Sequence, residues 1–384
     1  MSHGAPIDGM ALRAVARRRL PRFVFDFVDG GAYGEQALAR NRAAFDTLCL
    51  TPRILAGNVT RSTALQLFGR RLAAPFGIAP LGMAGLIHPR IDQALAKAAQ
   101  DFGVPYVLST AATTALESIQ ARAPESWFQL YVGRDPTIVD DLIARADTAG
   151  VPVLVLTADV PTPGKRLRDL HNRFVLPFRP TARMAFDLLR HPRWSWRLLT
   201  GGAPRFVNLE RYGAPGASAA SLAQAMAAQS SARFDWNLLG EIRRRWPRPM
   251  LLKGVLHAAD AKRALDAGVD GIIVSNHGGR QLDAAPAPLH VLPEIRAALG
   301  PGVPILLDGG VRTGEDIARA LCCGATMTLL GRPFLYAAAA LGPTTGPALL
   351  MQCLTNELDH AMGQLGCSTI NDLNSALLSL PIHT

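Results

Sequence analysis

Short apolar runs alternate with longer amphipathic stretches through most of this chain. Each run is rich in Val, Ile and Leu, ends in glycine or a polar residue, and is followed by an Ala-rich stretch of helical length. Strands that alternate with such helices favour a parallel sheet, and eight units in a row predict a closed (β/α)₈ TIM barrel over residues 74–340. A doubly wound sheet is disfavoured because no G-x-G-x-x-G follows the first run. The predicted strands are residues 76–80, 106–109, 127–131, 153–157, 250–253, 271–275, 303–308 and 327–330.

The barrel pattern is flanked by helical segments at both ends. Residues 1–73 form a predicted helical N-terminal extension, with helices at 7–20, 21–28 and 35–48. Residues 341–384 are predicted to hold the C-terminal helices and tail. We treat residues 1–384 as one domain. There is no uninterrupted apolar run long enough to span a bilayer, and no basic start followed by an apolar core that would indicate a secretory signal.

The alternation breaks once, between the fourth and fifth strands, at an insertion assigned to residues 160–235. A connection this long after a barrel strand covers the mouth of the active site, and long loops are usually functional or disordered. Residues 165–211 hold eleven Lys or Arg against three Asp or Glu, which is most of the net charge of +10. Residues 184–190 and 194–199 mix large apolar side chains with Arg, and residues 214–227 are of low complexity and expected to be poorly ordered.

Composition excludes several other kinds of protein. The five cysteines are scattered without metal-ligand spacing, so we predict no metal site and expect reduced thiols in the cytoplasm. The positive charge could indicate nucleic-acid binding, but it lies in an apolar, Trp-bearing insertion and not on a recognisable reader module. We therefore expect no nucleic-acid partner.

Chemically active side chains gather where the predicted strands end, which is where barrels carry their chemistry. His277 and Arg280 follow the sixth strand, and two glycines between them allow a sharp turn that lets both face one pocket. His277 is a candidate general base. Asp159, after the fourth strand, could orient it, while Arg166 and Arg280 could grip a carboxylate and Tyr131 could donate to a carboxylate or oxyanion. The alternative for His277 is a polar loop residue without catalytic function.

The loops after the seventh and eighth strands have the composition of a phosphate site. They read Asp308-Gly-Gly-Val-Arg312 and Gly331-Arg332, at the place where barrels bind phosphate through glycine backbone N–H groups. Lys253, with Ser109, Gln129 and Thr157 opposite, could hydrogen-bond a flat heteroaromatic ring, although a salt bridge to a nearby carboxylate would also explain the lysine. These residues predict a barrel oxidoreductase that acts on a small anion with a phosphate-bearing cofactor.

The chain strongly resembles the FMN-dependent (S)-2-hydroxy acid dehydrogenases and oxidases. The likeness extends from Leu20 to about Gly366 and rests on residues 275–283 (SNHGGRQLD), 127–131 (WFQLY), 307–312 (LDGGVR), 330–332 (LGR) and 172–174 (NRF). The resemblance implies His277 as base supported by Asp159, and Tyr131, Arg166, Arg280, Gly82 and the residue at position 27 at the substrate. It implies FMN held by Ala79, Pro80, Leu81, Gly82, Ser109, Gln129, Thr157, Lys253, Ser275, Asp308, Gly309, Gly310, Arg312, Gly331 and Arg332.

One position departs from the family pattern. Most members have Tyr, whose phenol helps to hold the substrate carboxylate, where this chain has Phe27. A hydrogen bond to a charged group contributes about 1.5 to 3 kcal/mol, so its loss should weaken the binding of small acids by about one to two decades. We expect the site to compensate with an apolar contact and to favour a larger, aryl side chain.

The insertion resembles that of the bacterial membrane-associated L-lactate and (S)-mandelate dehydrogenases more than that of the soluble oxidases. The resemblance rests on residues 161–164 (PTPG) and 191–196 (HPRWSW), and Arg beside Trp, Phe and Leu suits a monotopic segment in anionic headgroups. It implies peripheral association with the cytoplasmic side of the inner membrane, a quinone acceptor and a tetramer. The alternatives are a soluble oxidase that reduces O₂ to H₂O₂, a silent flavin-binding protein docked on the membrane, and an insertion that is only a solvated lid.

Overall fold

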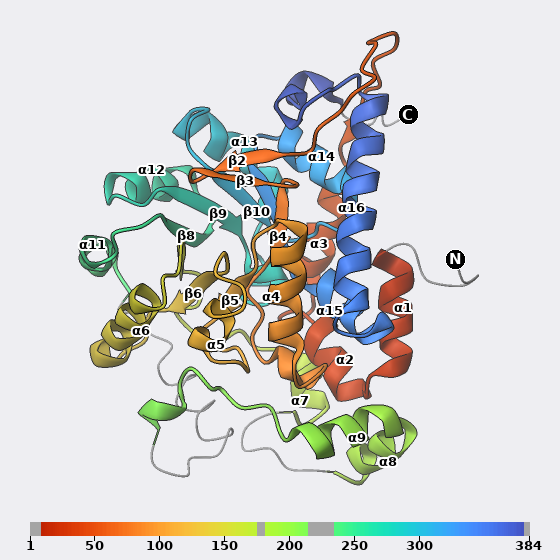
Figure 1. Ribbon diagram of the computed structural model, residues 1–384, viewed down its shortest axis with the longest axis vertical. Helices are drawn as coiled ribbons and strands as arrows, with labels where there is room; N and C mark the ends of the chain where they lie inside the picture. Colours follow the sequence, from red (N-terminus) through yellow and green to blue (C-terminus); the bar gives the residue numbers. More distant parts are fainter. Residues whose placement is uncertain (1–8, 175–180, 214–233, 380–384) are drawn as a thin grey trace.

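A closed barrel of eight parallel strands forms the centre of the computed structural model, which describes residues 9–174, 181–213 and 234–379 (Figure 1). The strand order is β4-β11-β10-β9-β8-β7-β6-β5, and a parallel bridge between Ile78 and Tyr106 joins the two ends. The predicted TIM barrel is therefore confirmed. The strands are β4 (Phe76–Ile78), β5 (Val107–Ser109), β6 (Trp127–Tyr131), β7 (Leu154–Thr157), β8 (Met250–Val255), β9 (Gly271–Ser275), β10 (Ile305–Asp308) and β11 (Met327–Leu330).

Nearly every strand residue is buried, because one face fills the barrel and the other lies under the helices. This burial on both faces explains why the strands appear in the sequence as continuous apolar runs instead of alternating ones. The strands also contain buried polar residues, and most of these lie toward the carboxyl ends: Ser109, Gln129, Thr157, Lys253, Ser275 and Asp308. The parallel arrangement brings these strand ends to the same mouth of the barrel.

Some of the helices that surround the barrel begin at a side-chain cap. The Asp135 side chain accepts from the backbone N–H of Thr137 at the start of α6, and Thr313 and Asp316 form a capping box at the start of α14. Most of these helices lie where the pattern predicts them, whereas α5 and α11 are additional. The helices are α4 (Ile91–Phe102), α5 (Leu116–Gln120), α6 (Pro136–Thr148), α11 (Trp236–Arg245), α12 (Ala258–Asp266), α13 (Pro288–Leu299), α14 (Gly314–Cys322), α15 (Arg332–Leu341) and α16 (Thr345–Gln364).

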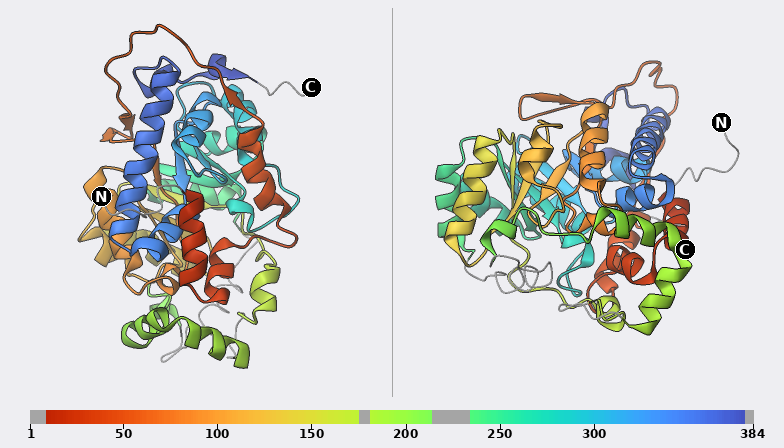
Figure 2. Two further views of the ribbon diagram at one scale, coloured as in Figure 1. Left: turned by 90° about the vertical axis from the view of Figure 1, so that its right-hand side faces the viewer. Right: turned by 60° about the horizontal axis from the view of Figure 1, so that its bottom comes forward.

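The N-terminal extension supplies three helices, α1 (Gly9–Arg19), α2 (Arg22–Asp29) and α3 (Gln36–Asp46). α1 packs along α15, and α15 packs on α16, so the two ends of the chain meet on one flank (Figure 2). In α2 the spacing of the phenylalanines divides them between two sides. Phe23 and Phe27 both contact Phe174, with ring centroids 5.3 and 5.5 Å away, while Phe25 stacks on Tyr336.

Two small antiparallel pairs were not predicted from the sequence. β2 (Leu65–Leu67) and β3 (Arg70–Leu72) form a hairpin, and β1 (Cys49–Leu50) pairs with β12 (Leu378–Ser379). The hairpin lies at the opposite end of the molecule from the insertion (Figure 1). The N-terminal extension is thus not purely helical.

The insertion follows β7 and contains α7 (Leu167–His171), α8 (Ala182–Arg190), α9 (Pro192–Gly201) and the short 3₁₀ helix η2 (Glu210–Tyr212). These elements lie at the lower end of the molecule in Figure 1, beside α2. Trp194 anchors α9, because its ring is buried and its Nε1 donates to the Leu86 carbonyl at 2.8 Å. The low-complexity stretch predicted at residues 214–227 lies outside the described residues.

Candidate active site

The loop after β9 places His277 at the barrel mouth through an unusual backbone. His277, Gly278 and Gly279 all have left-handed φ angles, of 58°, 63° and 73°. A Cβ on Gly279 would lie 2.7 Å from the Leu38 backbone nitrogen, and one on Gly278 would lie 2.9 Å from the Arg332 guanidinium. Larger residues therefore fit at neither glycine. A left-handed His costs about 1 to 3 kcal/mol, so the surrounding contacts hold the imidazole in this position against local strain.

The His277 ring lies between a carboxylate and a phenol. Its Nδ1 is 3.0 Å from Asp159 Oδ1, and its Nε2 is 3.4 Å from the Tyr131 hydroxyl. Burial opposes the ionisation of Asp159, but the charges of His277 and Lys253 outweigh it and lower the pKa of the carboxyl. An ionised carboxylate at Nδ1 keeps the proton on that nitrogen, which leaves Nε2 as the basic atom that faces the cavity.

Two arginines flank this ring, and both lie over Phe27. The guanidinium carbons of Arg166 and Arg280 are 5.1 and 5.3 Å from the centroid of the Phe27 ring. Arg280 donates to the backbone carbonyls of Phe27 and Gly30, at 2.8 and 3.1 Å, and forms no ion pair with any described residue. Its pKa is well below the usual value because the group is buried and lies near the charges of Arg166 and Arg332. A partly buried guanidinium that forms no ion pair with the described residues favours the binding of an anion.

Arg166 has a carboxylate partner that sequence reasoning missed. Its Nε lies 3.0 Å from Asp169 Oδ2, and Asp169 is buried at the cavity wall. Burial raises the pKa of Asp169, and the charges of Arg166 and Arg280 oppose that rise. The spacing of an acid three residues after Arg166 on a helix was the available sequence signal.

Lys253 has the carboxylate partner that was predicted as one explanation for it. Its Nζ donates to Ser275 Oγ at 2.8 Å and pairs with Asp308 Oδ2 at 2.8 Å, so the expected salt bridge is present. Burial opposes its protonation, yet the charges of Asp308 and Asp159 raise its pKa above the usual value. The lysine remains at the cavity wall as a buried cation.

Several buried polar atoms at the barrel mouth have no hydrogen-bond partner among the described residues. Gln129 Oε1 accepts from Ser109 Oγ at 2.9 Å, whereas the donor Gln129 Nε2 and the hydroxyl Thr157 Oγ1 are unpaired there. Unpaired buried polar groups are costly, so these atoms are available to a bound group. Donors at the ends of β6 and β7, with the ammonium of Lys253 beside them, suit the carbonyl oxygens and ring nitrogens of a flavin.

The loops after β10 and β11 fit a phosphate. Gly309 and Gly310 adopt positive φ angles of 121° and 88°, and Arg312 and Arg332 line the same cavity. Burial lowers the pKa of Arg312 to about 10, and the charge of Arg332 contributes to this shift. Arg332 is held by the carbonyls of Val28, Gly278 and Gly30 at 3.0, 2.9 and 2.8 Å. A phosphate dianion would neutralise this pair of guanidinium groups, so the donor set fits FMN.

Most of these groups line one cavity of about 1150 Å³. Ser109, Gln129, Asp159 and Ser275 lie behind its wall, where they hold or orient lining groups. The walls beyond the polar groups are largely apolar and include Met83, Phe206, Leu209 and Tyr212, which sequence reasoning did not identify. The predicted residues that line the cavity are Phe27, Ala79, Pro80, Leu81, Gly82, Tyr131, Thr157, Arg166, Lys253, His277, Arg280, Asp308, Gly309, Gly310, Arg312, Gly331 and Arg332.

Comparisons with known proteins agree with this site. Residues 16–380 match the family model described as FMN-dependent dehydrogenase. The chain is 40% identical to an L-lactate dehydrogenase of Pectobacterium atrosepticum, with 94% of each chain covered. It is 39% identical to an (S)-mandelate dehydrogenase of Pseudomonas putida, covering 94% of this chain and 91% of that protein.

A solved structure extends the agreement to three dimensions. The crystal structure of a monotopic membrane protein, (S)-mandelate dehydrogenase, superposes with a TM-score of 0.94 at 38% identity, covering 98% of this chain and all of that one. The match includes the barrel and nearly all of the sequence that surrounds it. The chain therefore belongs to the family of FMN-dependent dehydrogenases, and its cofactor is FMN.

Proposed function

We propose that this protein oxidises an (S)-2-hydroxy acid of the lactate or mandelate class to the 2-oxo acid. The observation that carries the proposal is the arrangement of His277 Nε2, the Tyr131 hydroxyl and the Arg280 guanidinium around one cavity. A base, a hydroxyl donor and an uncompensated cation are what a hydroxyl group next to a carboxylate requires. The names of the L-lactate and (S)-mandelate dehydrogenases that share the sequence support the same substrate class.

In this proposal the two arginines bind the substrate carboxylate and His277 accepts a proton from the substrate. Asp159 holds the ring through Nδ1 and stabilises the imidazolium once the proton has been taken. Bound FMN supplies the two-electron acceptor. Burial and the charge of Asp159 raise the pKa of Tyr131 to about 12, so its phenol stays protonated and donates to the substrate oxygen.

Phe27 directs the choice of side chain toward larger acids. It cannot donate to the carboxylate, and its ring instead presents an apolar face beneath both arginines. The same cavity is also lined by apolar residues of the barrel loops and the insertion, with Leu86, Phe206 and Leu209 among them. An aryl side chain gains more from such walls than a methyl group does, because buried apolar area contributes about 25 cal/mol per Å².

The insertion supports peripheral binding to an anionic membrane. Phe186, Leu189, Trp196 and Leu199, on α8 and α9, are between 60% and 78% exposed. The arginines of the same helices, among them Arg193 and Arg197, are exposed as well. No helix in the described part of the chain is long and apolar enough to cross a bilayer. Exposed apolar side chains beside arginines suit a segment that lies among lipid headgroups.

A membrane position would favour quinone as the electron acceptor. Leu188, Trp194 and Leu198 line the cavity from α8 and α9, the helices that also carry the exposed apolar side chains. An apolar acceptor could thus approach the flavin from the membrane side. The five cysteines are free, which fits the cytoplasmic face of the inner membrane. A homotetramer is part of the same proposal, on the basis of family resemblance alone.

The test of the reaction is anaerobic mixing of the purified protein with (S)-mandelate and, separately, with (S)-lactate. We expect the visible absorbance band of the oxidised flavin to bleach, faster with (S)-mandelate. Admitting oxygen and measuring H₂O₂ then separates a dehydrogenase from an oxidase, because stoichiometric peroxide would favour O₂ as the acceptor. A yellow protein that neither acid bleaches would contradict the proposed substrate class.

The membrane proposal is tested with vesicles that contain anionic lipids. We expect the protein to sediment with them at low salt and to be released by high salt or detergent. Trp196→Asp, which places a charge in the exposed apolar surface of α9, should weaken this binding by about tenfold or more. Equal sedimentation of the variant and the wild-type protein would contradict the assignment of this surface.

A further inference from the structure

Asp29, the last residue of α2, holds three helices together through a buried carboxylate. It is 4% exposed and accepts from Arg13 on α1 at 2.6 and 2.8 Å, from Arg168 on α7 at 2.8 Å and from Tyr336 on α15 at 2.6 Å. Burial opposes its ionisation, but the hydrogen bonds from Arg13, Tyr336 and Arg168 outweigh it and hold the pKa well below the usual range. The carboxylate is therefore ionised at neutral pH and binds its partners as a charge.

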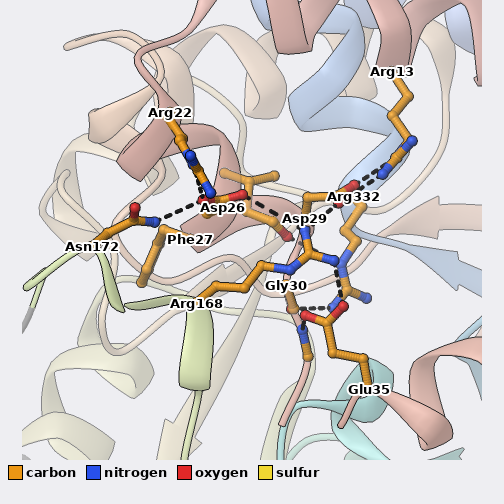
Figure 3. A network of polar contacts seen from close by, with 12 residues as sticks. Arg13, Arg22, Asp26, Phe27, Asp29, Gly30, Glu35, Arg168, Asn172 and Arg332 are labelled. Atoms are coloured by element: carbon orange, nitrogen blue, oxygen red, sulfur yellow. Dashed lines mark hydrogen bonds and ion pairs between the residues drawn. The ribbon is translucent and has the colours of Figure 1, made fainter. Parts of the chain in front are cut away.

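The backbone around Asp29 holds the cations of the cavity. The carbonyls of Phe27 and Gly30 accept from Arg280, and those of Val28 and Gly30 accept from Arg332. The side chain of Asp29 thus fixes residues 27–30 from one side. On the other side, the backbone carbonyls of this segment orient the guanidinium groups of Arg280 and Arg332. Figure 3 shows Arg332 on Gly30 and, next to it, Arg13 and Arg168 converging on Asp29.

Arg168 connects this segment to the insertion. It lies on α7, two residues after Arg166, and pairs with Glu35 as well as with Asp29 (Figure 3). Glu35 in turn accepts from the backbone N–H of Gly31 at 3.0 Å. The guanidinium also lies 3.7 Å from Asp26 Oδ1, so it pairs with carboxylates on either side of the turn that follows α2. Arg166 is the residue just before α7. The contacts of Arg168 with Asp29 and Glu35 therefore also set the distance between the Arg166 and Arg280 guanidinium groups, which both lie over the Phe27 ring.

We infer that Asp29 and Arg168 are positioning residues, and that their ion pair, the Asp29–Arg168 latch, holds α7 on α2 so that Arg166 and Arg280 face one carboxylate. The inference rests on the proposed function, in which those two arginines bind the substrate. Neither latch residue is among those that line the large cavity. Their effect is expected on the binding of the acid, because they set the geometry of the arginines and not the chemistry of the base.

Arg13 provides a matched control on the same carboxylate. Arg13→Met and Arg168→Met each remove one arginine from Asp29. Only Arg168 belongs to the insertion, whereas Arg13 belongs to α1. We expect R168M to raise the KM for (S)-mandelate by about tenfold, with flavin reduction at saturating acid changed by less than about threefold. R13M should keep the KM within about twofold of wild type while lowering the melting temperature, because it loosens α1.

The conservative variant R168K separates positioning from general stabilisation. Lysine can pair with Asp29 but lacks the planar fork that joins two carboxylates, so it should restore the KM only in part. If R168M loses its flavin, the KM of R168K is measured in its place. A KM for R168M within twofold of wild type, or equal KM changes in R168M and R13M, would overturn the latch.

Limited proteolysis tests the latch without turnover, so its result does not depend on the proposed function. Lys165 is exposed, and its carbonyl accepts from Tyr33 N–H in the same network. Tryptic cleavage after Lys165 under native conditions should be faster in R168M than in R13M. If wild-type protein were reduced by neither acid, the substrate proposal would fail, and cleavage would still test the latch. Equal cleavage rates in the two variants would refute it.

Discussion

Replacing Asp159 with asparagine removes the charge behind His277 while keeping the shape of the side chain. Oδ1 lies 3.0 Å from His277 Nδ1, and Oδ2 is buried and has no hydrogen-bond partner in the described part of the chain, so an amide fits the same space. After His277 takes a proton, the variant has no carboxylate opposite the imidazolium. A hydrogen bond to a charged group contributes about 1.5 to 3 kcal/mol. Since about 1.4 kcal/mol corresponds to tenfold in rate, we expect flavin reduction to slow by about ten- to hundredfold.

The measurement is stopped-flow reduction of the flavin at saturating (S)-mandelate without oxygen. Asp159 does not line the cavity, so the concentration of acid that gives half the limiting rate should change little, and the flavin content should match wild type. Asp270→Asn is the control, because it neutralises an exposed carboxylate just before β9, at the opposite end of the barrel. Its limiting rate should equal that of wild type.

Two results would refute this reasoning. A limiting rate within about twofold of wild type, with normal flavin content, would show that the charge does not stabilise protonated His277. An unchanged limiting rate with a large rise in KM would instead place Asp159 in substrate binding. Either outcome would remove the basis for Asp159 as the residue that supports His277.

Three further substitutions test other parts of the site. Phe27→Tyr restores a phenol beside the arginines and should improve (S)-lactate relative to (S)-mandelate by about tenfold in kcat/KM; an unchanged ratio would contradict the assigned role of Phe27. Tyr131→Phe should lower kcat/KM by about tenfold. The factor should be the same at every pH below the tyrosine pKa of about 12, because the phenol is protonated throughout that range. A ratio of wild-type to variant kcat/KM that changes with pH would argue against this. Gln129→Leu removes the unpaired donor Nε2 and should weaken FMN binding by about tenfold, measured by fluorescence of released flavin. Its control is Gln120→Leu, a buried glutamine on α5 whose Nε2 already donates to the Ser126 carbonyl at 2.7 Å, which should leave FMN affinity unchanged.

Much of the fold was predictable because barrel strands carry a local signal. Each of the eight runs is apolar on both faces, and each ends where a glycine or polar residue changes the pattern. The hairpin of β2 and β3 and the pairing of β1 with β12 were missed because their strands are only two or three residues long. Such short segments have too few positions to show a period.

The candidate site was predictable in its membership and less so in its contacts. Parallel strands of a barrel end at one mouth, so a list of strand ends already gathers Tyr131, Lys253 and His277. That Arg280 rests on the carbonyls of Phe27 and Gly30, or that Arg332 rests on those of Val28 and Gly30, has no counterpart in strand position. Those partners depend on how the N-terminal extension and the insertion fold back over the mouth.

The sequence by itself determined the barrel, the family, and the residue types that gather at the barrel mouth, because periodicity and strand ends are local features of the chain. The tertiary structure alone decided which charges are compensated. His277 meets Asp159 from 118 residues away, Arg280 meets Phe27 from 253, and Asp29 meets Arg168 from 139. The energy of such contacts depends on burial and on distances of a few ångströms, and both exist only once the chain has closed on itself.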